Sequence, residues 1–188
     1  GGRGAMLTRQ LLAFSRRDVP APEAIDLRAV VSDLDPLLRR LIGEDIELIA
    51  GLDEVHCVVC ADRGQLEQTV LNLVVNARDA LPGGGRIAID VHAVEVGPGE
   101  TEAGGAGGPG SYVRLAVTDD GTGMDPETLA HVFEPFYTTK EQGKGTGLGL
   151  STVYGIAERN RGWVRATSER EVGSTFQVYL PRLSEAPL

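Results

Sequence analysis

A glycine-rich run, GKGTGLGLS at residues 143–151, narrows the possible folds of this chain more than any other segment. Such a run often binds phosphate, because glycine lets backbone N–H groups approach a ligand closely. A P-loop is excluded, since Gly143-Lys144 is followed by Gly145 and not by Ser or Thr. A dinucleotide-binding fingerprint is excluded too, because Leu150 stands where its third glycine belongs. A mobile linker remains the alternative.

Length and charge limit the class of protein. A chain of 188 residues is long enough for one domain with a real core. Its formal net charge of -9 argues against nucleic-acid binding. The sequence has no apolar run of membrane-spanning length and no secretory signal, so we expect a cytoplasmic location, with membrane anchoring of the full-length protein left open. Cys57 and Cys60 are too few for a four-cysteine zinc site, and we interpret them as packing residues of a strand.

Hydrophobic periodicity predicts a chain of alternating helices and strands. We expect helices at residues 27–41, bent or interrupted near Pro36, and at 62–81, 126–133 and 148–160. We expect strands at 45–51, 55–60, 86–95, 111–118, 163–169 and 174–181, and a loop at 97–110. A separate helix is expected at 7–17. Because clean strand–helix–strand units are missing, this order indicates a mixed sheet with helices on one face.

The predicted helix at residues 62–81 has two distinct faces. One face is apolar and should pack on the sheet: Leu66, Val70, Leu73, Ala77 and Ala80. Another face carries Asn72, Asn76 and Asp79 at spacings of four and three. Asparagine is unfavourable inside a helix, because its side chain competes for backbone hydrogen bonds. This face is either an exposed polar surface or a site where an amide oxygen binds the Mg²⁺ of a nucleotide.

The segment VTDDGTGM, residues 117–124, is a second candidate site. A strand is predicted to end at Asp119, and the chain then turns through Gly121 and Gly123. A carboxylate at this place can accept a hydrogen bond from an amino group such as that of adenine, and the glycines let a ligand approach the backbone. Aspartate and glycine also form ordinary turns, so the segment alone does not decide.

The motifs together resemble a known family. NLVVNARDAL, DDGTGM and FEPFYTTK leading into GKGTGLGLS stand in the order found in the GHKL nucleotide-binding fold, and GSTFQVYLP fits its end. Over about residues 27–182 the chain resembles the catalytic and ATP-binding domain of sensor histidine kinases, of a hybrid-type two-component kinase. The resemblance implies an α/β (α+β) two-layer sandwich, the Bergerat fold, with a mixed, mostly antiparallel sheet covered on one face by helices. It also implies that residues 1–19 end a dimerisation and phosphoacceptor helix and that residues 20–188 form the catalytic domain.

The resemblance also assigns roles in binding ATP and Mg²⁺. Asn76 matches the magnesium-binding asparagine, Asn72 matches the first asparagine of the same motif, and we expect both at the catalytic centre. Asp119 matches the aspartate that recognises the adenine amino group, and Ser174 lies where the family often has a threonine near adenine. The glycine run becomes the hinge of an ATP lid that leads into a helix N-terminus, where backbone N–H groups face the phosphates. The other residues expected to bind the nucleotide are Gly121, Gly123, Lys140, Lys144, Gly145, Thr146, Gly147, Leu148 and Gly149.

One position departs from the family pattern. Many of these kinases have a basic residue three positions after the magnesium asparagine, whereas this chain has Asp79 there. Arg78, its neighbour, is therefore the candidate for a phosphate contact from this helix.

The family's reaction needs an acceptor histidine, and none of the three histidines matches the acceptor motif. His56, His92 and His131 are not followed by an acidic residue, and the first two fall in predicted strands. We therefore expect the acceptor in an upstream dimerisation and phosphoacceptor domain, whose last helix resembles residues 7–17. The implied partners are this domain and a response regulator receiver domain. The fragment is expected to be monomeric and the full-length protein a homodimer.

Three alternatives stay open within this fold. ATPases of the gyrase or chaperone type place a glutamate base four positions before the magnesium asparagine, but here that position is Asn72, which cannot accept a proton. A serine kinase acting on an anti-sigma partner shares the fold, although FEPFYTTK favours a histidine kinase. A degenerate, non-catalytic interaction module would have lost nucleotide binding, and the intact Asn76 and Asp119 argue against it.

Overall fold

The computed structural model of the chain describes residues 21–100, 108–138 and 149–184. A five-stranded sheet with the order β2-β4-β5-β7-β6 forms one layer. Its strands are β2 (Ile46–Leu52), β4 (Gly85–Val96), β5 (Gly110–Asp119), β6 (Trp163–Glu169) and β7 (Gly173–Pro181). β2 runs parallel to β4, and the other neighbouring strands are antiparallel, so the prediction of a mixed, mostly antiparallel sheet is confirmed.

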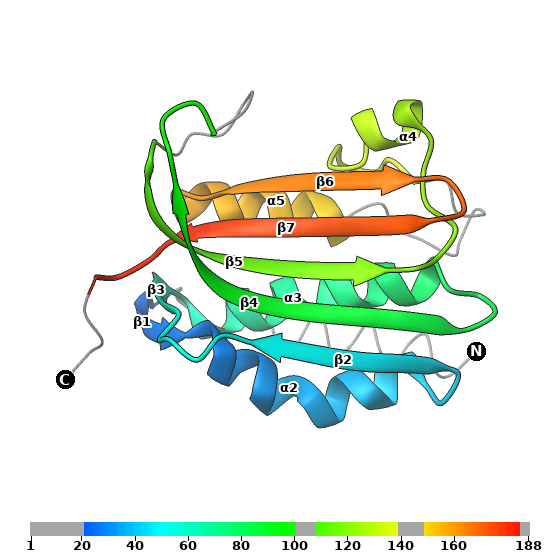
Figure 1. Cartoon of the computed structure of the whole chain (residues 1–188), viewed down its shortest axis with the longest axis horizontal. Helices are drawn as coiled ribbons and strands as arrows, with labels where there is room; N and C mark the ends of the chain where they lie inside the picture. Colours follow the sequence, from blue (N-terminus) through cyan, green and yellow to red (C-terminus); the bar gives the residue numbers. More distant parts are fainter. Residues whose placement is uncertain (1–20, 101–107, 139–148, 185–188) are drawn as a thin grey trace.

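Helices form the second layer. α2 (Leu27–Ile42), α3 (Arg63–Asp79) and α5 (Gly149–Arg159) lie against one face of the sheet (Figure 1). The short α4 (Pro126–Ala130) stands apart at one end of the sheet, in contact with β6 (Figure 1). The predicted two-layer sandwich is therefore confirmed. None of the helices in the described ranges is both long and apolar enough to cross a membrane.

Local side chains explain where the main helices begin. The carboxylate of Asp26 caps α2 by accepting the N–H of Arg28, and that of Asp62 caps α3 by accepting the N–H of Gln65. α2 ends at Gly43, whose φ of 80° suits glycine. Of the two outcomes expected near Pro36, a bend or an interruption, the interruption is wrong: α2 is continuous, with buried Leu34 and Leu38 on either side of the proline.

The apolar face predicted for α3 packs on the sheet. Leu66, Val70, Leu73 and Ala77 are buried, whereas Ala80 is only half-buried because it caps the end of the helix. On the sheet side they join a core that includes Ile87, Ile89, Leu115 and Val117. Because this core holds α3 on one face of the sheet, it also sets the side of the sheet on which Asn72 and Asn76 lie.

Three local expectations need correction, and a fourth is not tested. A short strand, β1 (Glu23–Asp26), was not predicted; it pairs with β3 (Val58–Ala61), which begins later than expected and leaves His56 in a loop. The helix expected at 126–133 ends at Ala130, where a series of turns begins. Cys57 is buried, as a packing residue should be, but Cys60 is exposed, which contradicts that interpretation. The helix expected at 7–17 lies outside the described residues.

Candidate functional site

Asp119 ends β5 with a buried carboxylate. Its residue is 4% exposed, and its Oδ1 accepts the N–H of Gly121 at 2.9 Å. Side chains alternate along a strand, so Asp119 shares the helical side of the sheet with Val117, whereas Thr118 lies on the opposite side. Burial raises the pKa of Asp119, and the nearby charge of Asp120 adds to this, although backbone hydrogen bonds from Gly121 and Ser174 oppose it. This carboxylate is thus poorly solvated and ready to accept a further donor.

The loop after Asp119 is held against the end of α3. The N–H of Thr122 donates to the carbonyl of Ala80 at 3.0 Å. A Cβ at Gly121 would collide with the same carbonyl, so only glycine permits this close approach. Gly123 has a φ of 65° and lies against the backbone of Glu169. The two glycines predicted here therefore let the loop pack between α3 and the turn that joins β6 to β7.

The two asparagines of α3 lie between this loop and α5. The amide nitrogen of Asn72 donates to the carbonyl of Gly149, the first described residue of α5, at 3.2 Å. Asn72 and Asn76 are both half-buried, so this face is more than an exposed polar surface. Ala80 follows Asn72 by eight positions, which is about 12 Å along a helix and on the scale of a nucleoside triphosphate. α3 thus connects the predicted phosphate side with the predicted adenine side.

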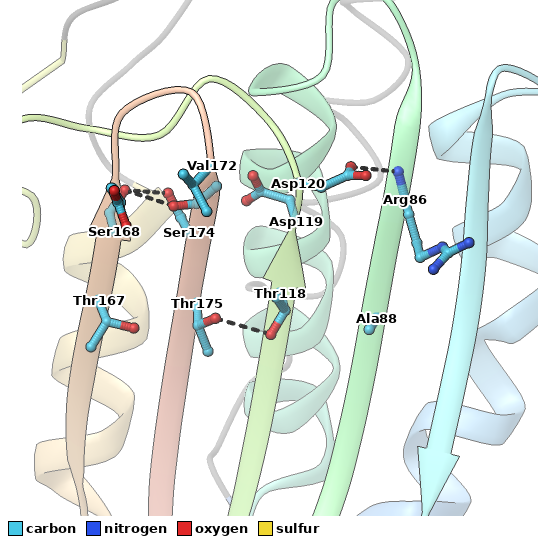
Figure 2. A pocket seen from close by; sticks show the side chains of 12 residues that line it. Arg86, Ala88, Thr118, Asp119, Asp120, Thr167, Ser168, Val172, Ser174 and Thr175 are labelled. Atoms are coloured by element: carbon cyan, nitrogen blue, oxygen red, sulfur yellow. Dashed lines mark hydrogen bonds between the residues drawn. The ribbon is translucent and has the colours of Figure 1, made fainter.

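Ser174 lies beside Asp119. The two residues are paired in register between β5 and β7, and Ser174 is 6% exposed. Its hydroxyl lies 2.8 Å from that of Ser168 at the end of β6 (Figure 2). The sequence analysis missed Ser168, because a serine near a strand end carries no distinctive signal.

The structure does not bring Arg78 to this group. One of its guanidinium nitrogens donates to the carbonyl of Leu41 in α2 at 3.3 Å, and the others donate to Asp79 Oδ1 at 3.1 and 3.3 Å. Its phosphate contact therefore remains a prediction. Other predicted residues lie outside the described part of the chain: Lys140, Lys144, Gly145, Thr146, Gly147 and Leu148.

A hollow of about 460 Å³ lies at the same end of the sheet, over β4, β5, β6 and β7 (Figure 2). Thr118 and Thr175 in its wall are 3.1 Å apart between their hydroxyl oxygens. Asp119, Ser168 and Ser174 also line this hollow, whereas neither asparagine of α3 does, so the hollow borders the predicted adenine side of the site and not its predicted phosphate side.

Comparison with known proteins identifies the class that this fold and site define. The family described as "Histidine kinase-, DNA gyrase B-, and HSP90-like ATPase" matches residues 61–184. The chain therefore belongs to this family, and within it the chain is a catalytic ATP-binding domain of a two-component sensor histidine kinase.

Individual relatives agree with this class. The chain is 48% identical to the sensor kinase CckA of Brucella abortus, over 97% of this chain and 19% of that protein. It is 40% identical to the two-component sensor PprA of Pseudomonas aeruginosa, over 78% of this chain and 15% of that protein. The chain therefore spans about a fifth or less of these curated relatives.

Solved structures show the same fold. The mycobacterial sensor histidine kinase MprB superposes with a TM-score of 0.67 at 26% identity, covering 86% of this chain and 98% of that one. Full-length ShkA in complex with AMPPNP superposes with a TM-score of 0.65 at 27% identity, covering 97% of this chain and 36% of that one. The predicted family, fold and class of enzyme are confirmed.

Proposed function

We propose that this domain binds Mg-ATP and transfers its γ-phosphoryl group to a histidine of an upstream dimerisation and phosphoacceptor domain. One observation carries the proposal: the loop that follows a buried carboxylate, Asp119, is hydrogen-bonded to the end of the helix that presents Asn72 and Asn76. A ligand that lies along α3 would find the hydrogen-bond acceptor Asp119 at one end and the side-chain amides of Asn72 and Asn76 toward the other. The ShkA structure, which contains an ATP analogue, supports a nucleotide as that ligand.

Asp119 would recognise adenine through its exocyclic amino group. Only the ionised carboxylate offers acceptors without a competing donor, and burial strengthens a hydrogen bond that water cannot replace. Gly121 and Gly123 would act indirectly, by letting the loop after Asp119 pack against Ala80 and Glu169, and Ser174 would lie beside the carboxylate.

Asn76 would hold the magnesium that accompanies the triphosphate. Its residue is half-buried, and among the described residues no hydrogen-bond partner of its side-chain amide is found. The described residues include no cluster of three carboxylate, cysteine or histidine side chains suited to a metal ion. One neutral amide oxygen fits a magnesium ion that arrives with phosphate ligands and keeps its waters, and the bound ion would neutralise phosphate charge.

The phosphate end would be completed by α5 and the lid. Asn72 fixes the start of α5 through Gly149, and the N-terminus of this helix favours negative charge. Lys140 and Lys144 would add positive charge in a chain whose net charge is -9. Arg78 would have to leave Asp79 and the carbonyl of Leu41 to contribute.

In the transfer step a nitrogen of the acceptor imidazole would bond to the γ-phosphorus while the bond to the β-phosphate oxygen breaks and ADP leaves. Positioning and charge stabilisation dominate such reactions, and these are what the site residues would supply. The histidines of this chain are placed elsewhere: His56 in a loop, His92 in β4, and His131 at the end of α4, 2.9 Å from Glu134. We therefore propose that residues 20–188 act on a separate acceptor, in a homodimeric, cytoplasmic kinase that serves a response regulator receiver domain.

Labelled ATP tests the proposal. The chain should take up little label and release little phosphate alone, but should transfer acid-labile phosphate to a separately added upstream domain. Asn76→Ala should abolish the transfer. Strong phosphate release by the chain alone would indicate an ATPase, and absence of nucleotide binding would indicate an interaction module.

A further inference from the structure

Ser168, near the end of β6, joins three segments around the adenine side of the site. Its Oγ accepts the N–H of Met124 at 2.8 Å and donates to the carbonyl of Gly173 at 3.1 Å. It also lies 2.8 Å from Ser174 Oγ (Figure 2). Met124 belongs to the loop after β5, while Gly173 and Ser174 begin β7. One half-buried side chain therefore connects the ends of three strands.

The hydrogen-bonding capacity of this hydroxyl is fully used. A serine has one proton to donate and two lone pairs to accept with. The proton goes to Gly173, one lone pair takes the N–H of Met124, and the other can take the hydroxyl proton of Ser174. Alanine at this position would leave three polar groups without this partner, at a half-buried site where Gly173 and Ser174 are buried.

These contacts lead directly to Asp119. Ser174 is its register partner, and a backbone hydrogen bond from Ser174 acts on the Asp119 carboxylate. Gly173 lies so close to the Asp119 carbonyl that a Cβ there would collide with it. The N–H of Glu171 donates to the carbonyl of Thr122 at 2.7 Å, which locks the turn after β6 to the loop after β5.

We propose that Ser168 is a positioning residue for adenine recognition. Its hydroxyl holds the loop of Met124 and the start of β7 so that Asp119 faces the base, and it does not touch the nucleotide itself. This inference rests on the proposed function, because it assumes that Asp119 binds adenine.

Three variants test it in calorimetric titrations with Mg-ADP. Ser168→Ala should weaken binding about tenfold, as expected for the loss of one to two buried hydrogen bonds. Ser168→Thr keeps the hydroxyl and should restore affinity to within about twofold of the parent, which a loss of packing alone would not explain. Thr175→Val is the matched control: it removes the hydroxyl that faces Thr118 on the opposite side of the sheet and should leave affinity unchanged.

Selectivity separates positioning from general destabilisation. Ser168→Ala should also lose preference for ADP over GDP, because a displaced Asp119 discriminates less between the bases. Fluorescence of Trp163, the single tryptophan, reports whether each variant is folded. If Ser168→Ala does not fold, Ser168→Cys replaces it, and its weak thiol should give an intermediate loss.

The outcomes are distinguishable. Parent-like affinity and selectivity in Ser168→Ala, or equal losses in Ser168→Ala and Ser168→Thr, overturn the positioning role and leave the proposed function standing. A parent chain that does not bind Mg-ADP overturns the proposed function and the role of Ser168 with it.

Discussion

Replacing Asp119 by asparagine should separate nucleotide affinity from stability. The asparagine can keep accepting the Gly121 N–H through its oxygen, but its amide nitrogen then presents a donor to the donor of adenine. A hydrogen bond to a charged group contributes about 1.5–3 kcal/mol, so the dissociation constant should rise about tenfold to about a hundredfold. The preference for ATP over GTP should fall as well.

The free energy of unfolding of Asp119→Asn should not fall along with its affinity for ATP. Burial raises the pKa of Asp119 in the folded domain. A carboxyl group whose pKa is higher in the folded than in the unfolded protein adds to the free energy of unfolding at pH values below its unfolded-state pKa. This contribution is lost as the pH rises through its folded-state pKa. At neutral pH the ionised carboxylate therefore carries a desolvation cost that asparagine removes, and the unfolding free energy should be kept or increased.

Calorimetric titration with Mg-ATP and Mg-GTP measures the affinities, and Trp163 fluorescence follows unfolding in urea. Asp120→Asn is the matched control, because it changes the charge equally one residue away, at an exposed carboxylate that accepts the Arg86 N–H at 2.8 Å. Parent-like ATP affinity and selectivity in Asp119→Asn would refute the assignment. A loss of binding accompanied by equal loss in Asp120→Asn would show that net charge, and not the adenine contact, is responsible.

Three further outcomes are expected. Gly121→Ala should lower the free energy of unfolding by about 1–3 kcal/mol, because the new Cβ meets the Ala80 carbonyl. Gly83→Ala is the control: its Cβ enters open space, so in the same denaturation assay it should be neutral or stabilise by up to about 1 kcal/mol. Asn76→Ala should abolish the gain in ATP affinity that magnesium gives, measured by titration with and without the metal. Affinity for Mg-ADP should fall as the pH drops through the raised pKa of Asp119, and a pH series on Asp119→Asn should lack this step.

The sequence predicted the main sheet because each of its strands has its own apolar pattern. β6 was predicted with its observed bounds, and β7 within one residue. β1 was missed because four residues, EAID, carry too little pattern, and their strand exists through pairing with β3. Pro36 caused the opposite error, because the sequence suggested a break that the structure does not have. Local rules place proline at a helix end, but tertiary packing keeps α2 continuous through it.

The sequence could identify residues of the candidate site, but it could not show which of them contact one another. Asn72 and Gly149 were each singled out, yet they are 77 positions apart, and only the fold shows that they are bonded. Ser168 could not be found, since its importance lies in three contacts that converge from separate segments. Arg78 shows the converse: a basic residue next to a motif can be engaged by a neighbouring helix, here through Leu41.

The bond from Asn72 to Gly149 also bears on why this chain should transfer phosphate and not hydrolyse ATP. A glutamate at this position is the water-activating base in ATPases that share the fold, but a carboxylate has no proton with which to bond the Gly149 carbonyl. Asn72→Glu should therefore lose about 0.5–1.5 kcal/mol of unfolding free energy without gaining phosphate release, while Asn72→Gln, which keeps the donor, should retain more stability. Urea denaturation and a phosphate-release assay on both variants measure this. Rapid, magnesium-dependent hydrolysis by Asn72→Glu would show instead that the missing base alone separates the two activities, and that the tie between α3 and α5 plays no part.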